Sequence, residues 1–310
     1  MIVSILDIKQ AYLRQEIDKA TFIERMFGQH KALYDYTRLV QDSQIKAIHI
    51  EAERVVFEDV KGVLIASATP DQRSAPIETL NFGSYEANEI KAMLHVIRDG
   101  DSILDIGGNI GWHSIVFSKA NPNSEIWAFE PIPPVYDQLL ENIALNGCKN
   151  VKAHNLALSD RQGEVQIFYD PDYSARSSAR DLSGGAGEPL TCQTDTLDAF
   201  ADRQDMPTVH VIKCDVEGAE LFVFRGALRL IDRDKPAIFA EMLRKWAEKF
   251  DYTPNDIIAL LRPLGYVCFE LGGADPVLIT QVDETTPGTN FLFLHPDTRP
   301  DLISRWSSSG

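Results

Sequence analysis

In the first part of the chain, apolar residues recur at helical spacing among many polar residues. They are followed by short apolar runs that are typical of strands. Apolar side chains such as Ile8, Tyr12, Leu33 and Tyr36 recur at intervals of three or four, which is typical of amphipathic helices. The expected elements, in order, are helices over 7–27 and 30–42, a β-hairpin with strands 54–58 and 63–68 around a turn at 59–62, and a helix carrying Ile90, Leu94 and Ile97. We expect residues 1–85 to form an N-terminal helical and β-hairpin attachment.

After residue 100 the pattern changes to short apolar runs that alternate with amphipathic helices. One of these helices, Val135–Asn146, ends at Gly147, as a helix with a C-terminal glycine should. Such alternation predicts an α/β fold with a mostly parallel sheet and helices on both faces, which binds ligands at the carboxyl ends of its strands. The expected strands are 102–106, 125–129, 151–157, 209–214, 237–241, 266–270 and 290–294.

Two segments depart from this alternation. Residues 170–189 are rich in Ser, Gly, Asp and Arg and nearly devoid of apolar side chains, so we expect a mobile loop or disorder there. The end of the chain, 297–310, is expected to be frayed.

The amino-acid composition disfavours some classes of binding partner. The 310 residues include 30 Lys and Arg against 46 Asp and Glu, a formal net charge of −16 that disfavours nucleic acid and anionic lipid as partners. The sequence shows no signal peptide and no apolar run long enough to span a membrane. Its four cysteines are scattered without a CxxC pair, so we expect a reducing, cytoplasmic location without a zinc site or disulfides.

The first strand of the alternating part ends in an acid and turns through glycines into a helix. A dinucleotide-binding GxGxxG pattern would need glycine at 107, 109 and 112, but Asn109 and Trp112 stand at the last two positions. What fits is D-x-G-x-x-x-G from Asp105 to Gly111, which suits a ligand carrying an ammonium group rather than a pyrophosphate. A nicotinamide oxidoreductase is therefore disfavoured, although a purely structural turn would give the same glycines.

The ends of the next two strands carry further polar residues. Glu130 follows the second strand, where a carboxylate can accept hydrogen bonds from both hydroxyls of a ribose. Ser159 and Asp160 follow the third strand and could bind an adenine edge. A surface carboxylate that caps a loop, and an ordinary turn, are the alternatives.

The fourth strand ends in a group of ionisable residues. Period-two alternation of an extended backbone predicts that Lys213, Asp215 and Glu217 lie on one side, before Gly218 turns the chain into a helix. Three such groups are costly to bury unless they are paired or bind a ligand. Lys213 with one carboxylate could be a structural ion pair only.

These residues carry a family resemblance. From about 86 to 294 the chain resembles the FkbM-like family of S-adenosylmethionine-dependent methyltransferases of the class I, Rossmann-like fold. The resemblance implies a seven-stranded sheet of order 3-2-1-4-5-7-6 with the last strand antiparallel, and a cofactor-binding methyltransferase domain over 86–296. It also implies O-methylation of a hydroxyl on a sugar, glycan or natural product. The matching segments are 105–111 with His113, 129–131, 157–160, 195–198 and, most specifically, 212–220.

Position by position, the resemblance implies roles in cofactor binding. The residues expected at the methionine end of S-adenosylmethionine are Asp105, Gly107, Gly108, Asn109 and Gly111, with Glu130 at the ribose, Ser159 and Asp160 at the adenine, and Glu86 as a further acid near the cofactor.

Methyl transfer to a hydroxyl requires the acceptor oxygen in line with the leaving sulfur and a base for its proton. Asp215 is the expected base, His113 is a second candidate, and Lys213 and Glu217 are expected beside them. Glu241, which ends the fifth strand, could share a Mg²⁺ ion with Asp215.

Other functions stay open at this point. An N-methyltransferase of protein or nucleic acid would commonly show an Asn/Asp-Pro-Pro-aromatic string after the fourth strand, where this chain has Asp215 to Gly218. A non-catalytic cofactor-binding module is a further alternative. For the N-terminal helices, simple packing, capping of the substrate and formation of a homodimer are all compatible with the pattern.

Overall fold

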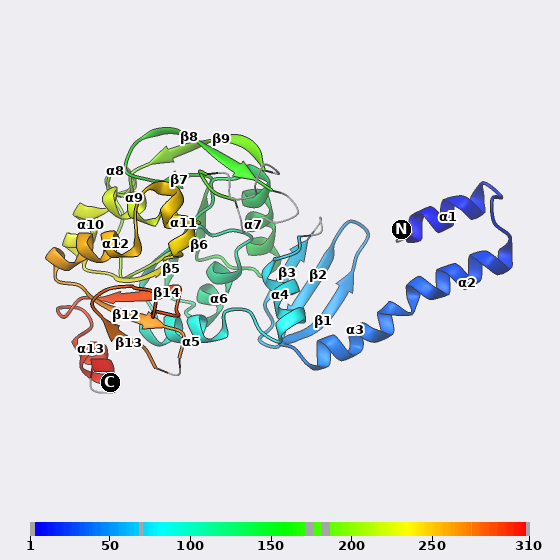
Figure 1. The fold of residues 1–310 in the computed structure, drawn as a ribbon, viewed down its shortest axis with the longest axis horizontal. Coiled ribbons are helices and arrows are strands. Elements are labelled where there is room, and N and C mark those ends of the chain that lie inside the picture. The colour runs from blue at the N-terminus through cyan, green and yellow to red at the C-terminus, as the bar shows by residue number, and fades with distance from the viewer. Residues whose placement is uncertain (1–3, 68–70, 171–176, 181–186, 274, 308–310) are drawn as a thin grey trace.

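The computed structural model describes residues 4–67, 71–170, 177–180, 187–273 and 275–307. Its core is an eight-stranded sheet with helices on both faces, and a helical arm projects to one side (Figure 1). The expected α/β, Rossmann-like architecture is confirmed. The described helices include none that is long and apolar enough to cross a membrane.

The strand order of the central sheet is β13-β12-β14-β11-β10-β4-β5-β6. Counted from β4 as the first core strand, seven of these strands follow the expected order 3-2-1-4-5-7-6, and β14 runs antiparallel to both its neighbours. The short edge strand β13, antiparallel to β12, is an eighth strand that the sequence did not predict. The strands are β4 (Ser102–Ile106), β5 (Glu125–Phe129), β6 (Val151–His154), β10 (Val211–Cys214), β11 (Ala237–Glu241), β12 (Val267–Leu271), β13 (Val277–Ile279) and β14 (Asn290–Leu294).

Alternate residues of the strands pack into two separate cores. Ile103 and Val211 face a layer that contains α5, α6 and α13, whereas Leu104 and Ile212 face α8, α9, α10 and α12. Both faces of the central strands are thereby buried, as the uninterrupted apolar runs of the strands require. The helices are α5 (Ala87–Val96), α6 (Trp112–Ala120), α7 (Pro133–Leu145), α8 (Leu197–Gln204), α9 (Glu220–Arg225), α10 (Leu228–Asp234), α11 (Arg244–Ala247), α12 (Pro254–Leu261) and α13 (Pro300–Ser307).

The N-terminal part contains three helices and a small antiparallel sheet. The expected helix over 7–27 is divided near Gln15, which has a positive φ of 60° that ends α1. The expected hairpin is present as β2 and β3, but β1, which pairs with β2, was not predicted. The elements are α1 (Ile5–Leu13), α2 (Lys19–His30), α3 (Ala32–Gln41), β1 (Ile45–Ile50), β2 (Val55–Asp59), β3 (Leu64–Ser67) and α4 (Ala75–Phe82).

Asn142 of α7 and Asn146, the residue that follows this helix, attach the small N-terminal sheet to the rest of the fold. The Asn142 amide accepts a hydrogen bond from the Ala66 backbone N–H at 2.8 Å and donates one to the carbonyl of Ile110 at 2.8 Å. Asn146 likewise binds both backbone groups of Leu64, at 2.9 and 2.6 Å. These amides satisfy the free edge of β3, which would otherwise carry unpaired backbone groups.

A second small sheet, of order β7-β9-β8, lies over the carboxyl ends of the central strands (Figure 1). The expected strand 151–157 is divided into β6 and the short β7 (Ala157–Leu158), and β8 (Gly163–Tyr169) was not predicted. The expected loop 170–189 is wrong at its end, because β9 (Glu188–Asp195) already begins at Glu188 and pairs with β8. Most of that segment, 171–176 and 181–186, lies outside the described residues.

The end of the chain differs from the expected frayed tail. Residues 300–307 form α13, and Leu302 and Trp306 are buried against the core layer that contains α5 and α6. Their spacing of four residues puts both on one helix face.

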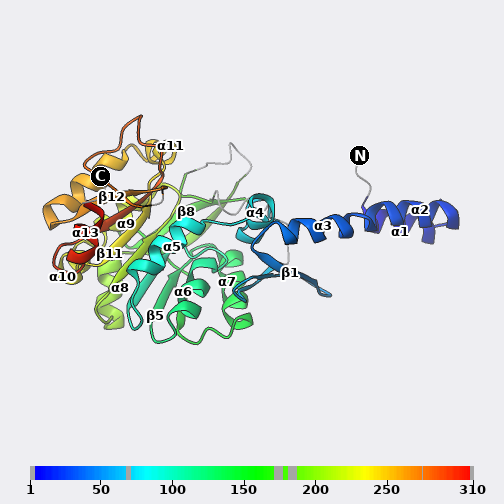
Figure 2. The same ribbon diagram turned by 90° about the horizontal axis from the view of Figure 1, so that it is seen from below.

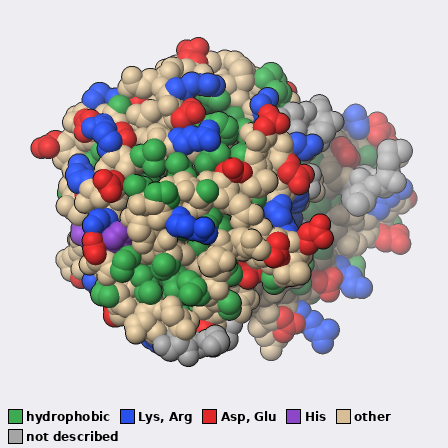
Figure 3. Space-filling view, turned by 60° about the vertical axis from the view of Figure 1, so that its left-hand side comes forward, with side chains coloured by type: hydrophobic (Ala, Val, Ile, Leu, Met, Phe, Trp, Pro, Cys, Tyr) green, Lys and Arg blue, Asp and Glu red, His purple; other side chains and the backbone are tan. Residues whose placement is uncertain are grey.

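On the side of the molecule opposite the arm, basic and acidic side chains are interspersed (Figure 3).

Candidate active site

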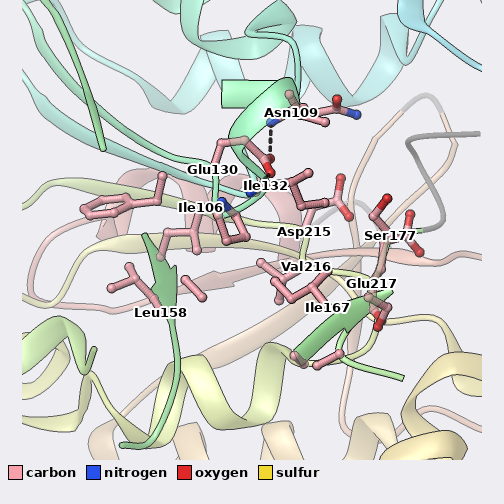
Figure 4. A pocket seen from close by; sticks show the side chains of 18 of the residues that line it. Ile106, Asn109, Glu130, Ile132, Leu158, Ile167, Ser177, Asp215, Val216 and Glu217 are labelled. Atoms are coloured by element: carbon pink, nitrogen blue, oxygen red, sulfur yellow. Dashed lines mark hydrogen bonds between the residues drawn. The ribbon is translucent and has the colours of Figure 1, made fainter. Parts of the chain in front are cut away.

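A cavity of about 240 Å³ opens at the carboxyl ends of β4, β5, β10 and β11, beneath the small sheet (Figure 4). Its wall combines apolar side chains, such as those of Ile106 and Ile167, with carboxylates that come from the ends of several strands. Of the residues predicted to form the site, Glu86, Gly107, Asn109, Glu130, Ser159, Asp215, Glu217 and Glu241 line this cavity.

The glycine turn after β4 is shaped by close backbone packing. A Cβ atom at Gly107 would collide with the carbonyl oxygen of Asp215, and one at Gly111 would meet the side chain of Leu139. Both glycines also have positive φ angles, of 79° and 93°. Gly107 therefore allows the ends of β4 and β10 to approach each other, whereas Gly108 and Gly111 pack against neighbouring elements and do not line the cavity among the described residues.

Glu130 is held rigidly at the cavity wall. Its two carboxylate oxygens accept hydrogen bonds from the backbone N–H groups of Asn109, at 3.0 Å, and Ile132, at 2.9 Å (Figure 4). Burial raises the pKa of Glu130 to about 7, against the effect of these two hydrogen bonds. The Oδ1 atom of Asn109 is buried without a hydrogen-bond partner among the described residues, so it is free to bind a ligand.

Asp105 lies beneath the cavity rather than in its wall. It is fully buried, accepts a hydrogen bond from the Ser114 hydroxyl at 2.6 Å, and lies 3.4 Å from the ammonium group of Lys213. Lys213 also donates to the carbonyl of Gly107 at 2.8 Å and lies 3.5 Å from Asp215. Although burial alone would lower it, the charges of Asp215 and Asp105 raise the pKa of Lys213 above its ordinary value.

Three carboxylates converge at the end of the cavity nearest β10 and β11. One oxygen from each of Asp215, Glu217 and Glu241 lies within 4.8 Å of the others. Burial, and then the charge of Asp215, raises the pKa values of Glu217 and Glu241 well above the ordinary value. The structure thus brings Asp215 and Glu217, which were expected for catalysis, together with Glu241, which was expected to share a metal ion with Asp215.

The reason for this convergence differs from the expected alternation along a strand. β10 ends at Cys214, and Glu217 has a left-handed backbone with a φ of 51°. A turn, not an extended backbone, therefore directs Glu217 toward Asp215. Lys213 lines a small adjoining cavity with Glu86 and Glu241.

His113 contacts Glu86 from outside the cavity wall. The Nε2 atom of His113 lies 3.0 Å from a carboxylate oxygen of Glu86, and His113 itself is buried outside the cavity wall. Although burial alone would raise it, the hydrogen bond and charge of His113 hold the pKa of Glu86 at about 2. Glu86 has a φ of 44°, an uncommon backbone conformation for a glutamate.

Ser159 and Asp160 are placed differently from each other. Ser159 lines the cavity beside Leu158, but Asp160 is exposed at the surface and lies outside the cavity wall. Val165, Ile167 and Ser178 also line the cavity, and none of the three was predicted as a site residue. The alternation of Val165, Ile167 and Tyr169 is a strand signal that could have identified the first two.

The profile of the Methyltransferase FkbM domain matches residues 105–268, which include the glycine turn and the carboxylate cluster. The chain belongs to this methyltransferase family. The match covers β4 to β12 and excludes the helical arm and the small N-terminal sheet.

Curated relatives share about a third or fewer of the aligned residues. Hexuronic acid methyltransferase AglP of Haloferax volcanii is 31% identical over 142 residues, which cover 46% of this chain and 56% of the relative. 2-O-methyltransferase NoeI of Sinorhizobium fredii is 25% identical over 148 residues, which cover 43% of this chain and 60% of the relative. The matched region thus spans less than two thirds of either relative.

One solved structure resembles this chain weakly. Methyltransferase FkbM from Methylobacillus flagellatus superposes with a TM-score of 0.40 at 14% sequence identity, over 85% of this chain and 59% of that chain.

Proposed function

We propose that this chain is an S-adenosylmethionine-dependent O-methyltransferase that acts on a hydroxyl of a sugar, glycan or natural product. The observation that carries the proposal is the cavity itself, which joins Glu130 and Asn109 at one end to the cluster of Asp215, Glu217 and Glu241 at the other. Family membership supplies the reaction class, and the cavity supplies residues for a cofactor and for an acceptor.

The charge of the cavity wall suits a cationic cofactor. Glu86, Glu130, Asp215, Glu217 and Glu241 face the cavity, and the lining cation Arg73 is ion-paired with Glu78. When bound, S-adenosylmethionine supplies a methyl group on a positively charged sulfur. Carboxylates around a low-dielectric cavity stabilise such a charge, whereas they would repel a pyrophosphate.

Within this proposal, Glu130 accepts hydrogen bonds from the ribose hydroxyls, because each of its oxygens keeps a free lone pair beside its bond to a backbone N–H. Asn109 and Glu86 bind the methionine end, and Ser159 lies at the adenine end. Asp105, Gly108, Gly111 and Asp160 are outside the cavity wall, so the first three would act by shaping the turn.

Asp215 is the proposed base. Its carboxylate faces the cavity, and the ammonium group of Lys213 lies 3.5 Å from it. As the oxygen–carbon bond forms and the carbon–sulfur bond breaks, the hydroxyl proton passes to Asp215. Glu217 and Glu241, whose pKa values are raised by burial and by the charge of Asp215, would orient the acceptor by hydrogen bonds. His113 is a positioning residue for Glu86.

The same three carboxylates could hold Mg²⁺, which takes oxygen ligands and would lower the pKa of the acceptor hydroxyl. Lys213 opposes this alternative, because its charge lies 3.5 Å from Asp215. Treatment with EDTA separates the two: activity lost and restored by Mg²⁺ supports the metal, and unchanged activity supports Asp215 as a base without one.

The acceptor class follows from the names of the relatives, a hexuronic acid methyltransferase and a 2-O-methyltransferase. To test the function, the full chain is incubated with methyl-labelled S-adenosylmethionine and a panel of neutral sugars, uronic acids and glycans. We expect label in a methyl ether, found by mass spectrometry, and none with Asp215→Asn. Label in an amine would instead support an N-methyltransferase, and cofactor binding without transfer to any acceptor would support a non-catalytic module.

A further inference from the structure

The helices α1, α2 and α3, together called the arm, expose an unusual amount of apolar surface. Among the large apolar side chains that are exposed in the described residues, most lie in the arm, including Ile23 at 56%, Phe27 at 65% and Tyr34 at 74% exposure. Both ribbon views show the arm projecting away from the central sheet (Figures 1 and 2). Neither α2 nor α3 contains a buried residue.

Helices of this length are not stable when they are bare. α2 has 12 residues and α3 has 10, and isolated helices this short are marginal in water without tertiary packing. α1 packs along α2, where Tyr12 stacks on Phe22 with ring centroids 4.4 Å apart, but it leaves α3 uncovered. A second surface must therefore cover the arm.

The open side of α2 and α3 forms one continuous apolar face. Lys31, between the two helices, keeps right-handed helical angles of −55° and −34°, so they form a nearly continuous rod. Met26 and Leu33, and likewise Phe27 and Tyr34, are seven residues apart, which is the repeat with which helices pair. The face consists of Ile23, Met26, Phe27, Leu33 and Tyr34, whereas Val40 at the end of α3 packs on the small N-terminal sheet.

The charge of the arm points to its partner. Residues 4–43 contain six basic and six acidic residues and have no net charge, whereas the whole chain carries −16. A basic partner would be attracted to the acidic domain rather than to the arm, and two acidic domains repel each other. Pairing of two neutral arms does not require a basic partner, and it keeps the two acidic domains apart.

The order of the charges along the arm is also self-complementary. If two arms pair antiparallel about a two-fold axis near Lys31, Glu24 of each copy faces Arg38 of the other, and these charges flank the apolar face on the same side. All four side chains of such a double pair are exposed and form no ion pair within the described part of the chain. Along one helix, residues 24 and 38 are about 21 Å apart, too far to pair within a chain.

We propose that the arm is a homodimerisation element, in which α2 and α3 of two copies pair antiparallel through the apolar face. The two-fold axis then buries Ile23 and Phe27 of one copy against the part of the partner's rod that carries α3. This interface is independent of the proposed catalytic activity.

Sedimentation velocity on the full chain tests the proposal, with S-adenosylmethionine binding as a control for folding. We expect a dimer at micromolar concentration, and at least a hundredfold weaker dimerisation for the double variant Phe27→Glu with Leu33→Glu. The matched control is Val277→Glu, which changes a side chain of 54% exposure on the edge strand β13. A monomeric natural chain, or a dimer lost only in Val277→Glu, would overturn the proposal.

A charge exchange tests the antiparallel register. Glu24→Arg alone and Arg38→Glu alone each place like charges together twice per dimer, so each should weaken dimerisation about tenfold. The combined variant Glu24→Arg with Arg38→Glu should restore the dimer. If the combined variant dimerises no better than the single variants, the antiparallel pairing is wrong.

Discussion

Lys213 and Asp105 form an ion pair at 3.4 Å beneath the floor of the cavity, and both residues are buried. The aspartate that marks the glycine turn in the sequence thus binds a lysine of the neighbouring strand. The parallel register places the two residues directly opposite each other in β4 and β10. The pair joins the half of the sheet proposed to bind the cofactor to the half that carries the carboxylate cluster.

Removal of the lysine should destabilise the fold. Lys213→Met leaves the buried carboxylate of Asp105 without its counter-charge, which costs about 3 kcal/mol or more. Urea denaturation followed by circular dichroism measures the loss. The exposed Lys249→Met is the matched control, and a Lys213→Met variant as stable as this control would show that the pair is dispensable.

Two glycines with similar backbone angles should respond differently to alanine. Gly107 and Gly147 have φ angles of 79° and 63°, but only at Gly107 would the added Cβ collide with the backbone, whereas at Gly147 it meets open space. We expect Gly147→Ala to cost about 1 to 2 kcal/mol for the left-handed backbone alone. Gly107→Ala should cost more than about 4 kcal/mol. Thermal unfolding compares the two variants, and equal losses would contradict the close approach of β4 and β10.

Cofactor binding should depend on pH through Glu130. Its pKa of about 7 means that the carboxylate ionises as the pH rises from 6 to 8, and only the ionised form accepts hydrogen bonds from both ribose hydroxyls without competition from its own proton. Affinity for S-adenosylmethionine should therefore increase with pH over this range. Titration calorimetry with Glu130→Gln should show about tenfold weaker binding without this pH dependence, whereas the exposed Glu164→Gln should behave as the natural chain.

The free energy of unfolding should decrease as the pH rises, because of Glu220. Burial raises its pKa to about 7, so the folded chain binds a proton that the unfolded chain has released. Its contribution is present in full below pH 4.5 and is lost as the pH rises through about 7, by on the order of 2 to 3 kcal/mol. Chemical denaturation at pH 5 and pH 8 should show this decline in the natural chain and less of it in Glu220→Gln. A decline that persists unchanged in Glu220→Gln would assign it to another group.

Asp215→Asn should separate chemistry from binding. The amide keeps the size of the side chain but cannot take a proton, so methyl transfer should fall at least about a hundredfold while S-adenosylmethionine still binds. Asp251→Asn, at an exposed position, is the control. Normal turnover of Asp215→Asn with an acceptor from the panel would remove Asp215 from the role of base.

The sequence predicted the central sheet well because its strands are buried on both faces. Runs such as Ser102–Ile106 and Ala237–Glu241 are mostly apolar segments with clear ends, and both strands have these bounds in the structure. The missed strands β1, β8, β9 and β13 are partly exposed, so their side chains follow no uniform apolar pattern. The short β13 also depends on its pairing with β12, which is a tertiary contact.

The residues of the candidate site were predicted from their positions at the ends of strands. Side-chain directions and contacts between strands could not be predicted in this way. Glu130, Asp215 and Glu241 reach the cavity because parallel strands end at one edge of the sheet. The sequence could not show that Asp105 is turned downward to Lys213, because that depends on the register of β4 against β10. Nor could it show that His113 lies outside the cavity wall and contacts Glu86 there.

The amide of Asn142 has a consequence for shortening this protein. This fully buried side chain joins the backbone of β3 to the carbonyl of Ile110 in the glycine turn. A chain trimmed to begin at residue 86 would lose the Ala66 partner and also Val63 and Ile65, which are buried in the same core layer as α6. The small N-terminal sheet is therefore part of the foundation on which the glycine turn rests, although the family match begins only at Asp105.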